Sequence, residues 1–253
     1  VGGLTVAREI MRQLPNETIY YFGDVKNCPY GDKTKEEIIK YTDRAVKFLI
    51  DKGVKMIVLA CNTATAAALD YLQDKYDIPI IGVVQPGARR AIQATENNKV
   101  LVLGTKFTAN SKVYDIEIEN INSEILVFDK ACPAFVPFIE SEGNLDKEAT
   151  KNILKESLNN TSNLGIDTVV LGCTHYPILK KDIEEYYGSS IKVISSGREA
   201  AREVSTVLGY AKLHQKKLNK KEHKFYISEA SENFNNIASK WLNKEITAEV
   251  VEI

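Results

Sequence analysis

Short runs of β-branched and other apolar residues alternate with longer segments of helical periodicity along almost the whole chain. An apolar run bounded by turn residues fits a buried strand, whereas apolar residues three or four positions apart are typical of a helix that packs on one face. This alternation predicts a parallel α/β architecture. The expected strands lie within residues 18–23, 54–60, 78–84, 99–105, 124–129, 166–172 and 191–195, with two further candidates at 224–230 and 247–253.

Helices are expected in the segments between these strands. The clearest cover residues 35–53, 64–76 and 176–188, and the first and last of them end at Gly53 and Gly188, as helices commonly do. The N-terminal sequence VGGLTVAREI is typical of a glycine turn that opens another helix, with no strand before it.

No low-complexity linker divides the chain, so the domain boundaries are inferred from the pattern itself. A Pro-Gly pair at 86–87 opens a new helix, and the segment ISSGREAAREV opens another further along the chain. We therefore expect residues 85–196 to form one α/β domain. Residues 1–84 and 197–253 are expected to form a second, discontinuous α/β domain.

The overall composition is that of an ordinary globular protein. Of the 253 residues, 44% are hydrophobic and 26% are charged, and the formal net charge is -1. Together these values exclude a disordered chain and argue against nucleic acid as a main partner. The basic run at 214–224 has no interleaved aromatic residues, so a solvated loop explains it best. No apolar run approaches the roughly 20 residues that span a bilayer and no signal peptide is evident, so we expect no membrane contact and a cytoplasmic location.

The four cysteines form no Cys-x-x-Cys pair. In the cytoplasm they are expected to stay reduced, and their spacing argues against both a disulfide framework and a structural zinc site. No metal or organic cofactor is indicated by any ligand cluster or phosphate-binding glycine loop. Cys28 and Cys132 are interpreted as structural residues.

Cys61 and Cys173 stand in matching contexts, because each comes directly after a predicted strand and before a predicted helix. In a parallel sheet these junctions face the binding crevice. A helix N-terminus favours thiolate, so we expect the pKa of each thiol to fall below its free value of about 8.5. Hydrogen-bonding residues that suit a carboxylate receptor follow both cysteines, namely Asn62, Thr63 and Thr65 after the first and Thr174 and His175 after the second.

Two such thiols favour proton transfer at a carbon centre. A cysteine protease uses one cysteine with a histidine, and a dithiol redox site is usually a Cys-x-x-Cys pair. Removal of a proton from one face of a carbon and its return to the other face require two acid/base groups, one thiolate and one thiol, with coupled titrations. His175 fits a charge relay there, and it equally fits a residue that caps the helix. The pattern therefore predicts a racemase or epimerase.

The sequence resembles the glutamate racemases, cofactor-independent enzymes of the aspartate/glutamate racemase superfamily that make D-glutamate for bacterial peptidoglycan. The resemblance covers nearly the whole chain and is carried by five segments. These are GGLTVAREI at 2–10, YFGD and CPYGDKT within 21–34, ACNTAT at 60–65, ACPAFVPFIE at 131–140 and LGCTHYP at 171–177.

The resemblance implies two pseudo-symmetric α/β domains with the substrate in the cleft between them. It also implies that the enzyme uses no cofactor and that its small-molecule partner is glutamate. The oligomeric state is left undecided, and a homodimer is one of the options. Cys61 and Cys173 match the two bases, and His175 and Glu140 match residues that assist the Cys173 side. The matching substrate contacts are Tyr30 and Gly31 through their backbone, and Asn62, Thr63, Thr108, Thr174 and His175.

From the sequence alone, Glu140 is interpreted equally well as an exposed acidic residue near a helix end, with no part in the reaction. Family members also carry a strand and an Asp-Ser-Gly segment before the position of Val1, so the first domain is expected to lack its N-terminal strand or the sequence to be a fragment. The alternatives that stay open are an aspartate racemase or another isomerase of the superfamily, a binding protein that has kept the cleft without turnover, and a redox pair of Cys61 and Cys173.

Overall fold

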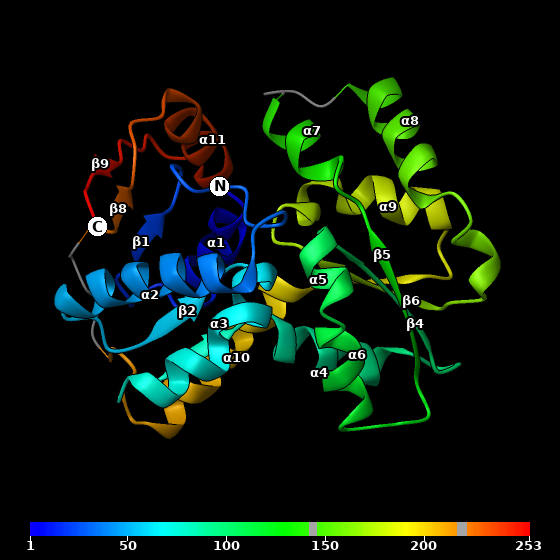
Figure 1. The fold of residues 1–253 in the computed structure, drawn as a ribbon, viewed down its shortest axis with the longest axis horizontal. Coiled ribbons are helices and arrows are strands. Elements are labelled where there is room, and N and C mark those ends of the chain that lie inside the picture. Colours follow the sequence, from blue (N-terminus) through cyan, green and yellow to red (C-terminus); the bar gives the residue numbers. More distant parts are fainter. Residues whose placement is uncertain (142–145, 217–221) are drawn as a thin grey trace.

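The computed structural model describes residues 1–141, 146–216 and 222–253, which form alternating strands and helices (Figure 1). Within these residues every paired strand runs parallel to its neighbour. The predicted α/β class is therefore confirmed, and all of the expected strands are present. The strands are β1 (Tyr20–Gly23), β2 (Ile57–Leu59), β3 (Ile80–Gly82), β4 (Lys99–Gly104), β5 (Leu126–Ala131), β6 (Thr168–Gly172), β7 (Lys192–Ser195), β8 (Lys224–Ile227) and β9 (Glu249–Val250).

The helices fill the segments between the strands, as the apolar periodicity predicts. They are α1 (Gly3–Gln13), α2 (Lys35–Asp51), α3 (Asn62–Lys75), α4 (Val84–Ala94), α5 (Lys106–Asn110), α6 (Val113–Glu119), α7 (Phe135–Ser141), α8 (Lys147–Leu158), α9 (Lys180–Tyr187), α10 (Ser196–Tyr210) and α11 (Glu232–Leu242), with 3₁₀ turns at Ser162–Leu164 and Tyr176–Leu179. Gly53 and Gly188, which follow α2 and α9, take positive φ angles of 75° and 87°, which glycine adopts at no steric cost because it has no Cβ atom.

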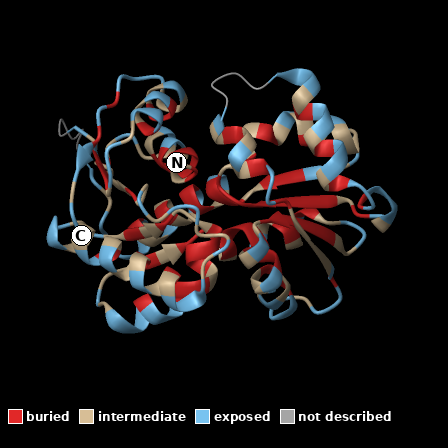
Figure 2. Cartoon of the chain, turned by 45° about the horizontal axis from the view of Figure 1, so that its top comes forward, coloured by how far each residue is buried: buried red, intermediate tan, exposed pale blue. Residues whose placement is uncertain are grey.

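The middle of the chain forms one four-stranded sheet in the order β5-β4-β6-β7. Alternate residues of a strand point to opposite faces. On β4, Leu101 and Leu103 pack in the core beneath α7, α8 and α9, whereas Val100 and Val102 pack against α4 and α6. Figure 2 shows the resulting layers, with buried strands in the centre and exposed residues on the outer helices.

The two ends of the chain form the other half of the molecule, where the strands belong to two sheets, β1-β8-β9 and β2-β3. Helices α2 and α3 bury residues such as Val46 and Leu72 against β2. Helices α1 and α10 pack together through Val6 and Val204. Helix α11 covers β8, with Phe234 in their shared core. The first and last segments of the chain therefore share cores.

The chain crosses between the halves where β3 runs into α4 and where β7 runs into α10. Helix α4 begins at Val84 and carries Pro86 in its first turn, where a missing N–H costs no helical hydrogen bond. Helix α10 begins at Ser196. Both helix starts agree with the sequence prediction, and α4 and α10 pack against each other.

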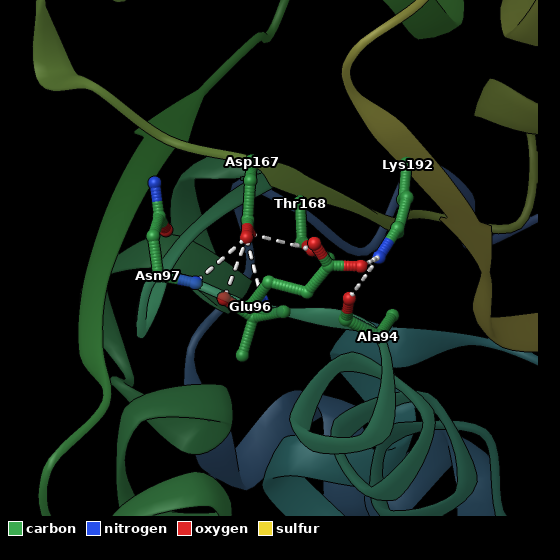
Figure 3. Close-up of polar contacts among 7 residues, drawn as sticks. Ala94, Glu96, Asn97, Asp167, Thr168 and Lys192 are labelled. Atoms are coloured by element: carbon green, nitrogen blue, oxygen red, sulfur yellow. Dashed lines mark hydrogen bonds and ion pairs between the residues drawn. The ribbon is translucent and has the colours of Figure 1, made fainter.

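At the amino-terminal edge of the four-stranded sheet, polar contacts of Asp167 and Lys192 join the turn after α4 to the starts of β6 and β7 (Figure 3). The carboxylate of Asp167 accepts hydrogen bonds at 2.6 to 2.9 Å from Thr95 Oγ1, Thr168 Oγ1 and the backbone N–H groups of Glu96 and Asn97. Beside it, Lys192 Nζ donates to Ala94 O at 2.8 Å and pairs with Glu96. The turn between α4 and β4 is thereby tied to the starts of β6 and β7.

Two sequence predictions need comment. Cys173 is followed by a turn and a 3₁₀ segment that begins at Tyr176, and α9 starts only at Lys180, so no α-helix begins directly after this cysteine. Of the basic run at 214–224, residues 217–221 lie outside the described part of the chain. No helix among the described residues is long and apolar enough to cross a membrane.

Candidate active site

A cavity of about 960 Å³ opens where the carboxyl ends of strands from both halves meet. It receives side chains from α1, the loop after β1, the start of α3, the loop after β4, α7 and the turn after β6. The predicted site residues that line it are Tyr30, Gly31, Cys61, Asn62, Thr63, Glu140, Cys173, Thr174 and His175. Residues from separate parts of the sequence are thus brought to one cavity, as the crevice rule for parallel sheets predicts.

Cys61 is the N-cap residue of α3. Its backbone is extended, with φ −148° and ψ 125°, and its sulfur accepts a hydrogen bond from the N–H of Ala64 at 3.4 Å. Thr65 supports the same turn, because its hydroxyl donates to Cys61 O at 2.8 Å. Free N–H groups at a helix start favour a negative charge on the cap. The sequence prediction of a helix that begins directly after Cys61 is therefore confirmed.

Cys173 lies deeper than Cys61, with 6% of its surface exposed. The Nδ1 atom of His175 lies 3.7 Å from its sulfur, so the imidazole is within hydrogen-bonding reach of this thiol. On its other side the histidine ring meets Glu140, with Nε2 and Oε1 2.7 Å apart. Glu140 comes from α7, 35 positions away in the sequence.

Burial decides the protonation of both thiols, against the sequence prediction. Desolvation raises the pKa of Cys173 to about 12, although the backbone N–H groups of His175 and Tyr176 act in the opposite direction. Desolvation likewise raises the pKa of Cys61 above its usual value, and the N–H groups of Ala64 and Thr63 lower it in part. Burial therefore favours the thiol form of both sulfurs, because the backbone N–H groups do not compensate for the loss of water.

The same burial sets the charges of the histidine and its partner. Desolvation lowers the pKa of His175, and the hydrogen bond to Glu140 offsets part of this effect. Burial alone raises the pKa of Glu140, but the hydrogen bond and the charge of His175 outweigh it and hold the pKa below its usual value. A neutral imidazole beside an ionised carboxylate is therefore the resting state at pH 7.

A cluster of three threonine hydroxyls spans the two halves beside Cys61. Thr63 Oγ1 lies 2.9 Å from Thr105 Oγ1 and 3.3 Å from Thr108 Oγ1. Thr108, predicted as a substrate contact, is 1% exposed and is not among the residues that line the cavity. Thr105 lines the cavity in its place. The sequence signal for Thr105 is its position directly after β4, where it is the N-cap of α5.

The loop after β1 is held by one carboxylate. Asp24 accepts hydrogen bonds from Tyr30 Oη at 2.6 Å, from Asn27 Nδ2 at 2.9 Å and from Ser228 Oγ at 2.8 Å. The side chain of Tyr30 is therefore engaged with Asp24, and both Tyr30 and Gly31 line the cavity. Gly31 also accepts a backbone hydrogen bond from Phe107, across the two halves, at 3.3 Å.

The start of α1 packs directly on the turn after β6, a contact that sequence reasoning missed. A Cβ atom on Gly2 would lie 2.4 Å from Nδ1 of His175 and 2.8 Å from Oγ1 of Thr174. Thr5 Oγ1 lies 2.7 Å from the carbonyl oxygen of Thr174, and the hydroxyl of Thr174 donates to Ala60 O at 3.1 Å. The available signal was the Gly-Gly pair before the helix, since paired glycines permit such close approach.

Asn62 turns its side chain toward the protein. Its Oδ1 atom accepts a hydrogen bond from Tyr114 Oη at 2.7 Å, and its Nδ2 atom donates to Ser196 Oγ at 3.3 Å. Asn62 is 2% exposed, and both partners are fully buried. The predicted contact of Asn62 with a substrate is thus restricted to its backbone and to the second N–H of its amide.

Besides the predicted site residues, apolar residues such as Ile19, Phe22, Val46 and Val58 line the cavity. Of the two remaining cysteines, Cys132 is fully buried in the apolar core, as predicted, whereas Cys28 is exposed in the loop before Pro29. All four are free thiols.

Known proteins resemble this chain over its full length. A family model described as Asp/Glu/Hydantoin racemase matches residues 4–204. A glutamate racemase of Staphylococcus epidermidis is 46% identical over 253 residues, which are all of this chain and 95% of that protein. A crystal structure of a glutamate racemase from Bacillus anthracis superposes with a TM-score of 0.95 at 40% identity, covering 100% of this chain and 94% of the other.

A glutamate racemase from Francisella tularensis, solved in complex with D-glutamate, superposes with a TM-score of 0.91 at 34% identity, covering 100% of this chain and 94% of the other. A family match over most of the residues, a relative with nearly half of its residues identical and two close structural neighbours all agree. The chain therefore belongs to the Asp/Glu/Hydantoin racemase family.

Proposed function

We propose that this protein interconverts L- and D-glutamate without a cofactor, with Cys61 and Cys173 as the two bases. The observation that carries the proposal is that these thiols, 112 positions apart in the sequence, come from different halves of the molecule and line one cavity. Glutamate is the substrate named for the full-length relatives, and a structural neighbour was solved with D-glutamate bound.

The reaction needs one thiolate and one thiol. The thiolate takes the proton from Cα, so that the C–H bond breaks and an S–H bond forms, and the electron pair is delocalised into the α-carboxylate. The thiol on the opposite face then gives its proton to Cα. The product has the opposite hand, and the two sulfurs have exchanged protonation states. Each positioned proton transfer contributes about 10²- to 10⁴-fold to the rate.

Substrate binding has to overcome the raised pKa of the thiols. The α-ammonium group of an amino acid brings a positive charge into the cavity, and an opposite charge within about 4–6 Å favours the ionised form of an acid. Around Cys61 the N–H group of Ala64 stabilises thiolate, and on the other side His175 is in reach of the Cys173 proton. The hydroxyls of Thr63, Thr105 and Thr174 are available to the carboxylates.

We also propose that the domains divide as the sequence pattern predicts, into residues 1–84 with 197–253 and residues 85–196. The four-stranded sheet lies wholly within the second group, which supports this division. In the cell the proposed reaction supplies D-glutamate for peptidoglycan in the cytoplasm. Four free thiols fit a reducing compartment.

The test is formation of D-glutamate from L-glutamate, followed by circular dichroism or by a coupled assay, with L-aspartate as the comparison substrate. We expect Cys61→Ser and Cys173→Ser each to abolish racemisation, while each variant keeps exchange of the α-proton of one enantiomer in D₂O. Cys28→Ser, at an exposed cysteine, is the matched control and keeps full activity. Full racemase activity in Cys61→Ser or in Cys173→Ser contradicts the two-base mechanism.

A further inference from the structure

A buried chain of hydrogen bonds connects Asn62, the residue after Cys61, to β6, the strand that ends directly before Cys173. Asn62 Nδ2 donates to Ser196 Oγ at 3.3 Å, and Ser196 Oγ donates to the carbonyl oxygen of Leu171 at 3.1 Å. Leu171 lies in β6, two positions before Cys173. The start of α3, the crossing into α10 and the end of β6 are therefore fastened together behind the cavity.

Tyr114 fixes the orientation of this chain. Its hydroxyl donates to Asn62 Oδ1 at 2.7 Å, which leaves the Nδ2 end of the amide facing Ser196. Tyr114 belongs to α6 and is 0% exposed. Its ring packs in the core between α4 and the sheet with residues such as Val102 and Val170. The hydroxyl is thus held by a large buried ring and not by a mobile side chain.

The backbone of α4 leaves little space around the chain. A Cβ atom added to Gly87 would lie 3.1 Å from Tyr114 Oη and 3.1 Å from Ser196 Cβ. Tyr114 and Ser196 therefore pack closely against α4. Because the site is buried, an unpaired polar group here costs about 1–3 kcal/mol. The position of these hydrogen bonds indicates a role besides stability, because they connect the two halves that each supply one cysteine.

We propose that Tyr114 is a positioning residue that, through Asn62 and Ser196, sets the separation of the two sulfurs across the cavity. This inference rests on the proposed two-base reaction. A proton transfer depends steeply on the distance between donor and acceptor, and misplacement by about 1 Å can lower a rate about 10²-fold. Tyr114 touches neither sulfur among the described contacts and acts through the start of α3, where Cys61 is the cap.

The test is Tyr114→Phe, which removes the hydroxyl and keeps the buried ring. We expect kcat to fall about 10- to 100-fold with a smaller change in KM. We also expect the primary isotope effect with α-deuterated glutamate to rise in both directions, because proton transfer becomes more rate-limiting. A purely structural role lowers the fraction of folded enzyme and leaves the isotope effect unchanged. Tyr187→Phe is the matched control, because its hydroxyl lies 2.7 Å from Thr161 Oγ1, away from the cavity.

The double variant Tyr114→Phe/Asn62→Ala tests whether Tyr114 acts through Asn62, and it is expected to be no slower than Asn62→Ala alone. Ser196→Ala is a second single variant that interrupts the same chain, and it keeps the test decisive where Tyr114→Phe does not fold. Unchanged kcat and isotope effect in a folded Tyr114→Phe or Ser196→Ala protein overturn the positioning role. Absence of racemisation by the unmodified protein instead overturns the proposed function, so the two failures are distinguishable.

Discussion

Glu140 holds His175 in place beside Cys173, with 2.7 Å between Glu140 Oε1 and His175 Nε2. The carboxylate comes from α7 and the imidazole from the turn after β6, so two elements converge behind one thiol. The hydrogen bond fixes the orientation of the ring and offsets part of the effect by which burial lowers its pKa. A histidine held in this way is suited to exchange a proton with the thiol in front of it.

Replacement of Glu140 by glutamine tests this pair. The hydrogen bond to Glu140 raises the pKa of His175 against the larger effect of burial, so Glu140→Gln lowers that pKa further. We expect kcat to fall about 10- to 100-fold, and the part of the pH–rate profile that requires protonated His175 to move to lower pH. An NMR titration of the His175 ring measures the shift directly. Glu36→Gln, at an exposed position of α2, is the control, and an unchanged His175 titration in Glu140→Gln contradicts the role of the pair.

A methyl group at Gly2 is expected to displace His175. The added Cβ would lie 2.4 Å from His175 Nδ1, which no real structure tolerates without movement. Gly2→Ala should therefore lower kcat by about 10-fold or more while the melting temperature changes little, because the displaced group lies at the cavity and not in the core. Gly209→Ala is the matched control, since its Cβ would meet His214 only at 3.5 Å, an ordinary contact. Equal activity of the two variants argues against the predicted displacement.

Release of the loop after β1 should weaken substrate binding. Asp24 accepts hydrogen bonds from three side chains that hold this loop, among them Tyr30. We expect Asp24→Asn to raise KM about 10-fold, with a smaller effect on kcat, because the backbone of Tyr30 and Gly31 loses its fixed position. Steady-state kinetics with L-glutamate measures the effect. A lower kcat with unchanged KM would instead assign Asp24 to the chemical step.

Asp167 is expected to stabilise the fold in a pH-dependent way. Burial alone raises its pKa, but hydrogen bonds from Glu96, Thr95 and neighbouring groups lower it below the usual value. An acid whose pKa is depressed in the folded state stabilises the protein above its unfolded pKa of about 3.9, and this contribution is lost as the pH falls through the lower folded value.

The matching variant is Asp167→Asn. We expect its free energy of unfolding at pH 7 to be about 1 kcal/mol lower than that of the unmodified protein, a modest value because solvent screens this partly exposed group. The difference should shrink below about pH 4. Urea unfolding at several pH values measures it, and Asp70→Asn, at an exposed position of α3, serves as the control. A difference that persists unchanged at pH 3 would rule out the ionised carboxylate as its source.

The strands and the Cys61 junction could be predicted because their signals are local. The β-branched runs mark the strands, and Cys61 precedes polar and small residues that begin a helix. The turn after Cys173 was less predictable. Its conformation depends on Thr5, whose hydroxyl contacts Thr174 across 169 positions of sequence. No pattern within the turn itself reports a contact over that separation.

Thr105, Tyr114 and the protonation of the thiols were missed for related reasons. Thr105 and Tyr114 contact the start of α3, at Thr63 and Asn62, only after the two halves pack together. The sequence shows the N–H groups at a helix start but not the depth of burial. In the case of Cys173, desolvation is the larger effect and raises the pKa to about 12. The sequence therefore indicated the N–H groups that lower the pKa of each thiol but not the burial that outweighs them.

The deep position of the two sulfurs also affects how the resting protein withstands chemical damage. Peroxide and alkylating reagents attack thiolate and not thiol. Cys173 is 6% exposed and, like Cys61, has a pKa that desolvation raises, which favours the neutral thiol. Sulfurs that burial keeps in the thiol form are intrinsically resistant to oxidants and electrophiles.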